Sequence, residues 1–258
     1  MIKFFRKIRQ RLLLENRFSK PASLARPTDL SGRAGRYLLY AIGEIFLVVI
    51  GILIALQINN WNKEKAQSET ELNILNVMLK NIQSDLEDMD FNIAFYNIRL
   101  NANRTVLEAL KNPDIVPDTL AYTYANLGSN PYFIESTSAY DNLKSIGFEM
   151  IQNDSLREEI MQLYGIKYQW MGELEDDHAK FYSDKLEPLL LANFKTTVPY
   201  ESASPVVKIQ ELAENHAFKE ALRYNSGWTF FILGRYSEAA KAAKSLQDNI
   251  RIEINKRK

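Results

Sequence analysis

Two histidines and several carboxylates are the side chains in this sequence that could do metal or acid–base chemistry. Glu175 and His178 form a Glu-x-x-His pair, which on a helix is half of a carboxylate-bridged di-iron site. The other histidine, His216, has no glutamate three residues before it, and the chain has no cysteine to supply thiolate ligands or a thiol nucleophile. We therefore interpret residues 173–178 as a solvated acidic helix face. We expect no metal, no cofactor, no catalytic residue and no enzymatic activity.

Glu44 is the residue whose position is chemically most expensive, because it lies inside an apolar run. Residues 37–58 contain 14 Leu, Ile, Val or Phe among 22 residues, and a helix of this length spans roughly 33 Å against a hydrocarbon core of about 30 Å. These side chains favour insertion by on the order of 4 to 8 kcal/mol, which outweighs the roughly 3 kcal/mol expected against one acid. The sequence therefore predicts a transmembrane helix, in which Glu44 either reaches toward the headgroups or faces a partner.

Small residues on the same run favour helix association. Gly51 and Ala55 form a small-x-x-x-small pair, and Gly43 precedes Gly51 by about two turns. We expect this face to let a second transmembrane helix approach closely beside Glu44.

The flanks of the run predict its orientation. Residues 1–36 carry ten basic side chains against two acidic ones, which places the amino terminus in the cytoplasm and the rest of the chain outside. Tyr37 and Tyr40 at one end and Trp61 at the other are typical of membrane interfaces. Because the run starts too late for a cleaved signal peptide, we expect an uncleaved signal anchor.

The amino-terminal segment divides into two parts. Residues 1–14 place apolar side chains on one helical face among Lys and Arg, as in a basic amphipathic helix lying on the bilayer; the alternative is a topology signal alone. Residues 15–36 contain Pro, Gly and Ser and predict a flexible tether. The expected partner of the basic residues is the lipid bilayer and not nucleic acid, since no nucleic-acid-binding motif accompanies them.

Residues 59–258 are predicted to form an all-α domain, an up-and-down helical bundle with heptad-patterned helices. Apolar residues recur every three or four positions from Leu72 to Leu110, with a skip at Asn103. Further apolar residues at Phe91, Phe95 and Ile98 widen the stripe beyond a two-stranded coiled coil. A second seam from Leu222 to Ile250 predicts one long terminal helix.

Further helical units are predicted between these two seams. One covers residues 136–152, and another begins at a capping box formed by Ser155 and Glu158 and continues to Pro188, which should kink or end it. Residues 195–205 are expected to be a loop. Together with the two seams, this gives four helical units.

The segments MIKFFRKIRQRLL and YAIGEIFLVVIGILIALQINNWN resemble the amino-terminal signature of a large family of uncharacterised single-pass membrane proteins of gram-negative bacteria. A weaker similarity covers residues 138–164. The tether between Lys20 and Arg36 is longer than the commoner family pattern. The resemblance implies an inner-membrane location, a periplasmic domain and helical architecture, and it brings no assigned activity.

Three functions are compatible with this organisation. The first is an interaction or scaffold module outside the inner membrane that binds a protein partner or assembles with itself. The second is a periplasmic sensor of a small ligand, of unknown identity, that acts through a cytoplasmic partner. The third is a subunit of an ion-coupled membrane complex that uses Glu44.

Overall fold

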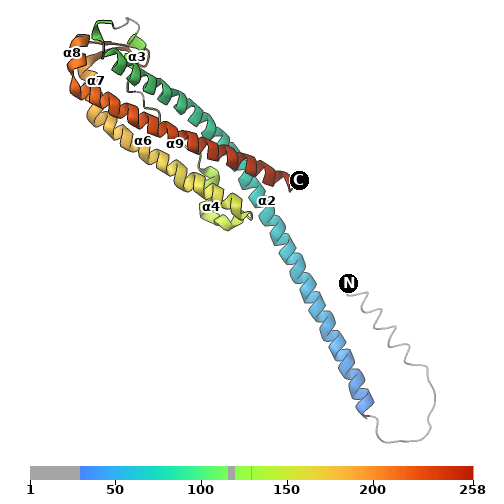
Figure 1. Ribbon diagram of the computed structural model, residues 1–258. Coiled ribbons are helices and arrows are strands. Elements are labelled where there is room, and N and C mark those ends of the chain that lie inside the picture. Colours follow the sequence, from blue (N-terminus) through green and yellow to red (C-terminus); the bar gives the residue numbers. More distant parts are fainter. Residues whose placement is uncertain (1–29, 116–119, 129, 258) are drawn as a thin grey trace, which may run out of the picture. The chain divides into compact units, whose positions relative to one another are not determined.

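The computed structural model describes residues 30–115, 120–128 and 130–257 (Figure 1). The chain forms two compact units, residues 1–62 and 63–258. The predicted amphipathic helix at 1–14 and the predicted tether up to residue 29 lie outside the described residues.

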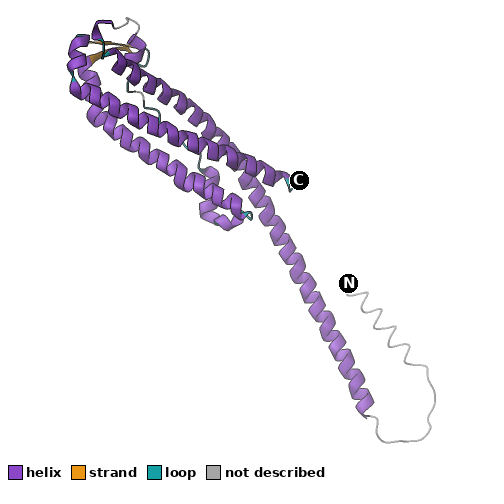
Figure 2. Cartoon of the chain, in the orientation of Figure 1, coloured by secondary structure: helices purple, strands orange, loops and turns teal. Residues whose placement is uncertain are grey.

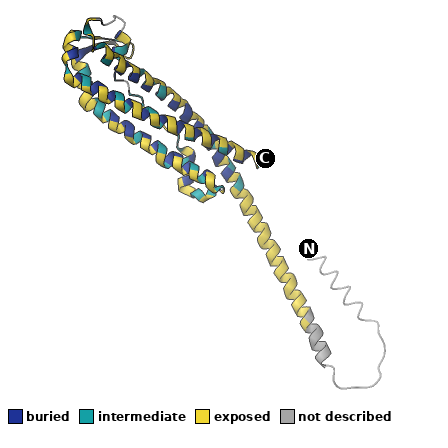
Figure 3. Ribbon diagram, in the orientation of Figure 1, coloured by how far each residue is buried: buried dark blue, intermediate teal, exposed yellow. Residues whose placement is uncertain are grey.

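The described part of the first unit belongs to helix α2, Leu30–Ala109. No proline interrupts the chain between Pro27 and Pro113. The helix begins seven residues before the predicted start of the span, so the end of the predicted tether is helical. Over residues 40–58 every side chain is exposed, as Figure 3 shows in yellow. By length and composition this helix can cross a membrane, and exposed aliphatic side chains are stable there rather than in water. The chain therefore carries a membrane anchor.

Three long helical rods, drawn in purple in Figure 2, form the second unit. The first rod is α2 from residue 63. The third is α9, His216–Asn255. The second rod joins five helical segments end to end: α5 (Asp154–Gln162), η5 (Leu163–Tyr168), α6 (Gln169–Phe181), η6 (Tyr182–Leu186) and α7 (Glu187–Asn193). The all-α bundle is confirmed, with its apolar core between the rods.

The predicted seams largely coincide with this core. Every seam position predicted between Leu222 and Ile250 on α9 is buried. On α2 the seam is buried or half-buried, and Asn103, which was treated as a skip, is fully buried in the same stripe. Of the three residues predicted to widen the stripe, Phe95 and Ile98 are half-buried, whereas Phe91 is 58% exposed and lies outside the buried stripe.

Short elements connect the rods. These are η2 (Pro113–Ile115), α3 (Ala121–Ala125), α4 (Ser138–Ile146), η4 (Phe148–Met150), β1 (Phe194–Val198), β2 (Ser202–Pro205) and α8 (Ile209–Glu214). The predicted loop at 195–205 is largely an antiparallel hairpin of β1 and β2, in which Phe194 pairs with Pro205 and Tyr200 adopts a φ of 62°. Strand pairing supplies hydrogen-bond partners to backbone groups that a loop would leave to water.

Two details of the second rod differ from the sequence predictions. Pro188 does not end the rod, because it falls in the first turn of α7, where its missing N–H is not required, and the wider π-helical turn η6 precedes it. The rod begins one residue after Asn153, whose side chain accepts a hydrogen bond from Leu156 N at 3.2 Å. The capping box predicted at Ser155 and Glu158 was therefore wrong, because Asn153 caps the helix first.

An extended segment precedes the predicted helical unit at 136–152, which the structure shows as α4 and η4. Residues 130–137 form neither helix nor strand, and within 136–152 helical structure is limited to α4 and η4. The chain therefore returns along the first rod in extended form. Of the four predicted helical units, three are the long rods of the described bundle and the fourth is the short unit of α4 and η4.

Candidate functional site

The residues predicted to act in the membrane all lie on α2. Gly43, Glu44, Gly51 and Ala55 are exposed, and a methyl group added to either glycine would meet nothing within 4 Å. At about 100° per residue, Glu44, Gly51 and Ala55 fall within about 40° of one another, whereas Gly43 lies about 80° from Gly51. The structure thus presents one acid and two small residues on a single exposed stripe, with Gly43 at its edge.

The predicted interface aromatic residues lie on the same helix. Tyr40 is 73% exposed and Trp61 is 61% exposed, as side chains at a membrane interface require. Tyr37 is helical, but its side chain is outside the described set.

Inside the bundle, a row of polar side chains on α2 faces the extended segment. We name this row the polar ladder; its members recur every three or four residues and are Asn81, Asp85, Asp88, Asn92, Tyr96, Arg99 and Asn103. Five of them are at most 1% exposed: Asp85, Asn92, Tyr96, Arg99 and Asn103. Burying such groups is unfavourable unless each finds a hydrogen-bond partner.

The first three members of the ladder, Asn81, Asp85 and Asp88, accept hydrogen bonds from backbone N–H groups through their side-chain oxygens. Ser136 N donates to Asp85 Oδ1 at 2.7 Å, and Ile134 N donates to Asp88 Oδ2 at 3.0 Å. Ala139 N donates to Asn81 Oδ1 at 3.1 Å, at the start of α4.

The other half of the ladder donates to the same segment. Asn92 Nδ2 donates to the Tyr132 carbonyl at 3.0 Å, and Tyr96 Oη donates to the Pro131 carbonyl at 3.0 Å. Arg99 Nη1 donates to Asn130 Oδ1 at 2.6 Å. An extended segment without a partner strand leaves its backbone groups unpaired, and the ladder pairs them. These buried polar groups therefore hold the extended segment in place on the first rod.

Glu175 and His178 join this network from the second rod. They are 3% and 1% exposed, so the prediction of a solvated face was wrong for both, although Glu173, Asp176 and Asp177 are exposed as expected. Their three-residue spacing continues the inward stripe of α6. That stripe was the signal in the sequence that could have placed them inside.

Both side chains have hydrogen-bond partners inside the bundle. Glu175 Oε1 accepts hydrogen bonds from Tyr96 Oη, at 3.0 Å, and from Tyr236 Oη, while Oε2 accepts from Phe133 N at 3.1 Å. His178 Nε2 lies 2.8 Å from Asn225 Oδ1, which assigns the proton to Nε2. Among the described residues, no three His, Asp or Glu side chains are grouped to hold a metal ion.

Burial changes the proton affinities within this network. It raises the pKa of Glu175 and raises the pKa of Asp85 to about 6, because a carboxylate loses its hydration. Burial and the nearby Arg99 charge lower the pKa of His178 to about 4, so this imidazole is neutral at pH 7. Burial lowers the pKa of Arg99 to about 10, which leaves the guanidinium charged at pH 7.

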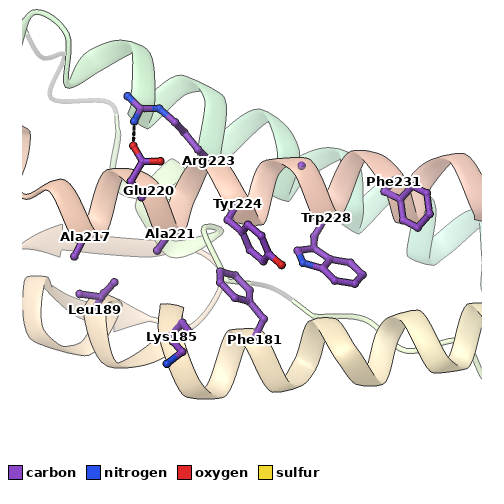
Figure 4. A pocket seen from close by; sticks show the side chains of 11 residues that line it. Phe181, Lys185, Leu189, Ala217, Glu220, Ala221, Arg223, Tyr224, Trp228 and Phe231 are labelled. Atoms are coloured by element: carbon purple, nitrogen blue, oxygen red, sulfur yellow. Dashed lines mark hydrogen bonds and ion pairs between the residues drawn. The ribbon is translucent and has the colours of Figure 1, made fainter.

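The outer surface offers a different kind of site, a groove of about 940 Å³ between α9 and the second rod (Figure 4). In the figure Phe181 points from the second rod toward Tyr224 on α9, and their ring centroids are 4.6 Å apart. Trp228 and Phe231 continue the aromatic lining along α9. Sequence analysis missed this groove, although Tyr224, Trp228 and Phe231 recur every three or four residues beside the buried seam.

A second groove lies on the other side of α9, against α2. It has a volume of about 540 Å³ and shares Phe231 with the first groove, and Phe230 and Arg104 also line it. Phe230 and Phe231 are 66% and 41% exposed. The outward side of α9 therefore carries an aromatic ridge with a groove on each flank.

Comparison with known proteins identifies the family of the chain. No curated protein and no solved structure matches it. A family model matches residues 44–187, which run from Glu44 on the membrane helix through the polar ladder to the second rod. Because this match covers more than half of the sequence, the chain belongs to a family of unknown function, DUF6090.

Proposed function

We propose that the protein is a membrane-anchored interaction module. Helix α2 fixes it in a bacterial inner membrane with its amino terminus in the cytoplasm, and the bundle in the periplasm binds a protein partner or further copies of the chain. We propose no catalytic role for it.

The observation that carries this proposal is that the polar side chains inside the bundle already have partners, whereas aromatic side chains are exposed outside it. The buried polar groups bind the chain's own backbone and side chains, whereas aromatic side chains and two grooves lie on the surface. Exposed aromatic patches of this kind are typical of protein interfaces. The exposed stripe of Glu44, Gly51 and Ala55 offers a second contact surface inside the bilayer.

The proposed orientation follows from charge. Ten basic side chains in residues 1–36 favour retention of that segment on the cytoplasmic side. Because the chain has no cysteine, a single introduced cysteine reports its own location.

The topology test compares Ser237→Cys, at an exposed position on α9, with Ser19→Cys in the amino-terminal segment. In intact spheroplasts, a membrane-impermeant maleimide should label the cysteine at 237, and it should label the cysteine at 19 only after lysis. The opposite pattern would show that the bundle is cytoplasmic and would overturn the orientation.

The interaction test uses the full chain at native abundance. Chemical crosslinking in cells, followed by extraction in a non-ionic detergent, should recover the protein in species larger than the monomer. Recovery of the monomer alone would contradict a function in assembly.

A further inference from the structure

A small pocket lies at the end of the bundle where α3, η6, α7 and the β1–β2 hairpin meet. Its volume is about 230 Å³, and residues of all these elements line it. Figure 1 shows α3 and α7 at the same end of the bundle. Sites for drug-sized ligands have volumes of roughly 300 to 1,000 Å³, so this pocket suits a single small group.

The chemistry of the lining is unusual for this chain. We name the site the aromatic pocket; its lining includes four rings and one carboxylate, those of Tyr124, Tyr182, Phe194, Tyr200 and Glu187. No Lys or Arg is among the described residues that line it. Both grooves beside α9, in contrast, have basic side chains in their linings. The aromatic pocket therefore combines ring surfaces with a negative charge.

Packing within the bundle fixes three of the four rings. Tyr124 and Phe194 are each 8% exposed, and their ring centroids are 4.9 Å apart. Tyr182 is half-buried, and its ring lies so close to Gly128 that a Cβ at this position would overlap it. Glycine at position 128 thus allows the ring of Tyr182 to lie in the wall of the pocket.

The fourth ring belongs to the turn of the hairpin. Tyr200 has a φ of 62°, which is uncommon for a bulky residue, and its side chain is 57% exposed. Its carbonyl accepts a hydrogen bond of 2.8 Å from Nδ2 of the buried Asn126, which ties the turn to the end of α3. Burial does not explain a tyrosine in this conformation, since most of its ring is in solvent. A contact with a bound molecule explains it better.

Glu187 supplies the charge of the pocket. Burial and the nearby Glu187 charge raise the pKa of Tyr182, so the Tyr182 hydroxyl is neutral at pH 7. Glu187 forms no ion pair with a basic side chain among the described residues. Arg99 also acts on Tyr182, but its guanidinium donates to Asn130 and Thr229 inside the bundle. The negative charge in the lining is thus left for a ligand.

We infer that the aromatic pocket binds a small organic cation of the alkylammonium class, with its methyl groups against the rings and its charge balanced by Glu187. Aromatic rings attract cations at their faces, and a methylated ammonium has no N–H group that needs an acceptor. A metal ion is a poorer match, because Ca²⁺ requires roughly six to eight oxygen ligands. The inference goes beyond the proposed interaction function and does not depend on it.

The first test compares choline with its neutral isostere dimethylbutanol, in which a carbon atom replaces the charged nitrogen. Equilibrium dialysis of radiolabelled choline against the full chain in non-ionic detergent should show saturable binding. Unlabelled choline and tetramethylammonium should displace the label, and dimethylbutanol should do so at least about tenfold more weakly. Equal displacement by the neutral isostere, or no saturable binding, would overturn the inference.

Variants of Tyr200 test the contribution of its ring. Tyr200→Leu should weaken choline binding about tenfold, whereas Tyr200→Phe keeps the ring and should change it by less than about twofold. Tyr122→Leu is the control, because Tyr122 lies on α3, is 52% exposed and is not among the lining residues. Circular dichroism checks that each variant is folded. Equal losses in the Leu and Phe variants of Tyr200 would contradict recognition by the ring.

A change at Glu187 tests the role of charge. Glu187→Gln should weaken choline binding about tenfold and should make it less sensitive to salt. The matched control is Glu201→Gln, at an exposed position beside Tyr200 that does not line the pocket. Binding by Glu187→Gln as strong as by the wild-type chain would overturn the assignment of Glu187.

A last comparison identifies the source of the cation. A short-chain phosphatidylcholine, used below its micelle-forming concentration, carries the same trimethylammonium group on a lipid head group. Stronger displacement of the label by choline would indicate a free solute, and stronger displacement by the lipid would indicate a head group; both results keep the alkylammonium site. Displacement by neither compound would refute it. The crosslinking test of the interaction function has a separate readout, so failure of one proposal is distinguishable from failure of the other.

Discussion

At the scale of single residues, the bundle buries ionisable groups wherever the extended segment needs a partner. Glu175 is an example, since its carboxylate accepts hydrogen bonds from two tyrosine hydroxyls and one backbone N–H, which occupy most of its acceptor positions. Removing such an acceptor leaves buried donors unsatisfied, which is more costly than the net value of the bonds themselves.

Glu175→Leu should therefore lower the free energy of unfolding by about 2 to 3 kcal/mol, because Phe133 N and the hydroxyl of Tyr236 lose their acceptor. Urea unfolding of the full chain in non-ionic detergent, followed by circular dichroism, measures this change. Glu173→Leu, at an exposed position two residues away, is the control and should change stability by less than about 0.5 kcal/mol. Equal effects of the two substitutions would show that Glu175 is not buried.

His178 should make stability depend on pH. Its pKa in the folded chain is about 4, below the ordinary value of about 6.5, so the unfolded chain binds the proton first as the pH falls. The contribution of neutral His178 to the free energy of unfolding is thus fully present above pH 6.5 and is lost as the pH falls from about 6.5 to 4.

Between pH 7 and pH 4.5, the wild-type chain should lose about 2 to 3 kcal/mol more stability than His178→Gln, which keeps a donor for Asn225. Asp85 acts in the opposite direction in both proteins, since its raised pKa favours the folded chain at acid pH. Urea titrations at the two pH values check the difference, with the exposed His216→Gln as control. Parallel losses in wild type and His178→Gln would refute it.

At the scale of elements, hydrophobic periodicity predicted the helices that bury one apolar stripe. It did not predict a segment whose hydrogen-bond partners are distant in the sequence. The seam of α9 was found because buried residues recur every three or four positions. The segment at 130–137 was not found, because its hydrogen bonds run to side chains 31 to 51 residues away along the chain, a relation that no local pattern records. The aromatic ridge on the outward side of α9 was missed for another reason: its rings, such as Phe230 and Phe231, lie beside the buried seam and are exposed.

Close packing between elements is tested at Gly128, before the extended segment. A Cβ at this position would overlap the ring of Tyr182 and would lie 3.0 Å from Leu190 Cδ1. Gly128→Ala should therefore destabilise the bundle by about 1 to 3 kcal/mol in urea unfolding.

Gly172 on α6 provides the matched comparison, because a methyl group there would meet nothing within 4 Å. Gly172→Ala should stabilise the protein by roughly 0.5 to 1 kcal/mol through helix propensity alone. Changes in the free energy of unfolding with the same sign and size for the two substitutions would be inconsistent with this packing of Tyr182.

At the scale of the whole bundle, an ion cluster joins the end of the chain to the first rod. Arg257 Nη2 lies 3.0 Å from Glu71 Oε1 and 2.8 Å from Glu253 Oε1, and Glu71 is fully buried. Gln152 N also donates to Glu71 at 2.9 Å. This cluster ties three distant parts of the sequence together.

Arg257→Ala should reduce the free energy of unfolding by about 3 kcal/mol, because it leaves the Glu71 carboxylate buried without a cation. The neighbouring Lys256→Ala is the control, since the Lys256 side chain is 63% exposed, and it should have an effect of at most about 1 kcal/mol. Thermal and urea unfolding of both variants measure the difference. A small effect of Arg257→Ala would mean that the chain end is not needed to close the bundle.

The polar ladder also has a consequence for the order in which the chain assembles. A ribosome produces the first rod before the extended segment, and the extended segment before the second and third rods. The extended segment is half-buried or exposed along its whole length, so the later rods do not enclose it. Each layer can therefore settle on one that already exists, and the segment can bind the ladder as soon as it leaves the ribosome.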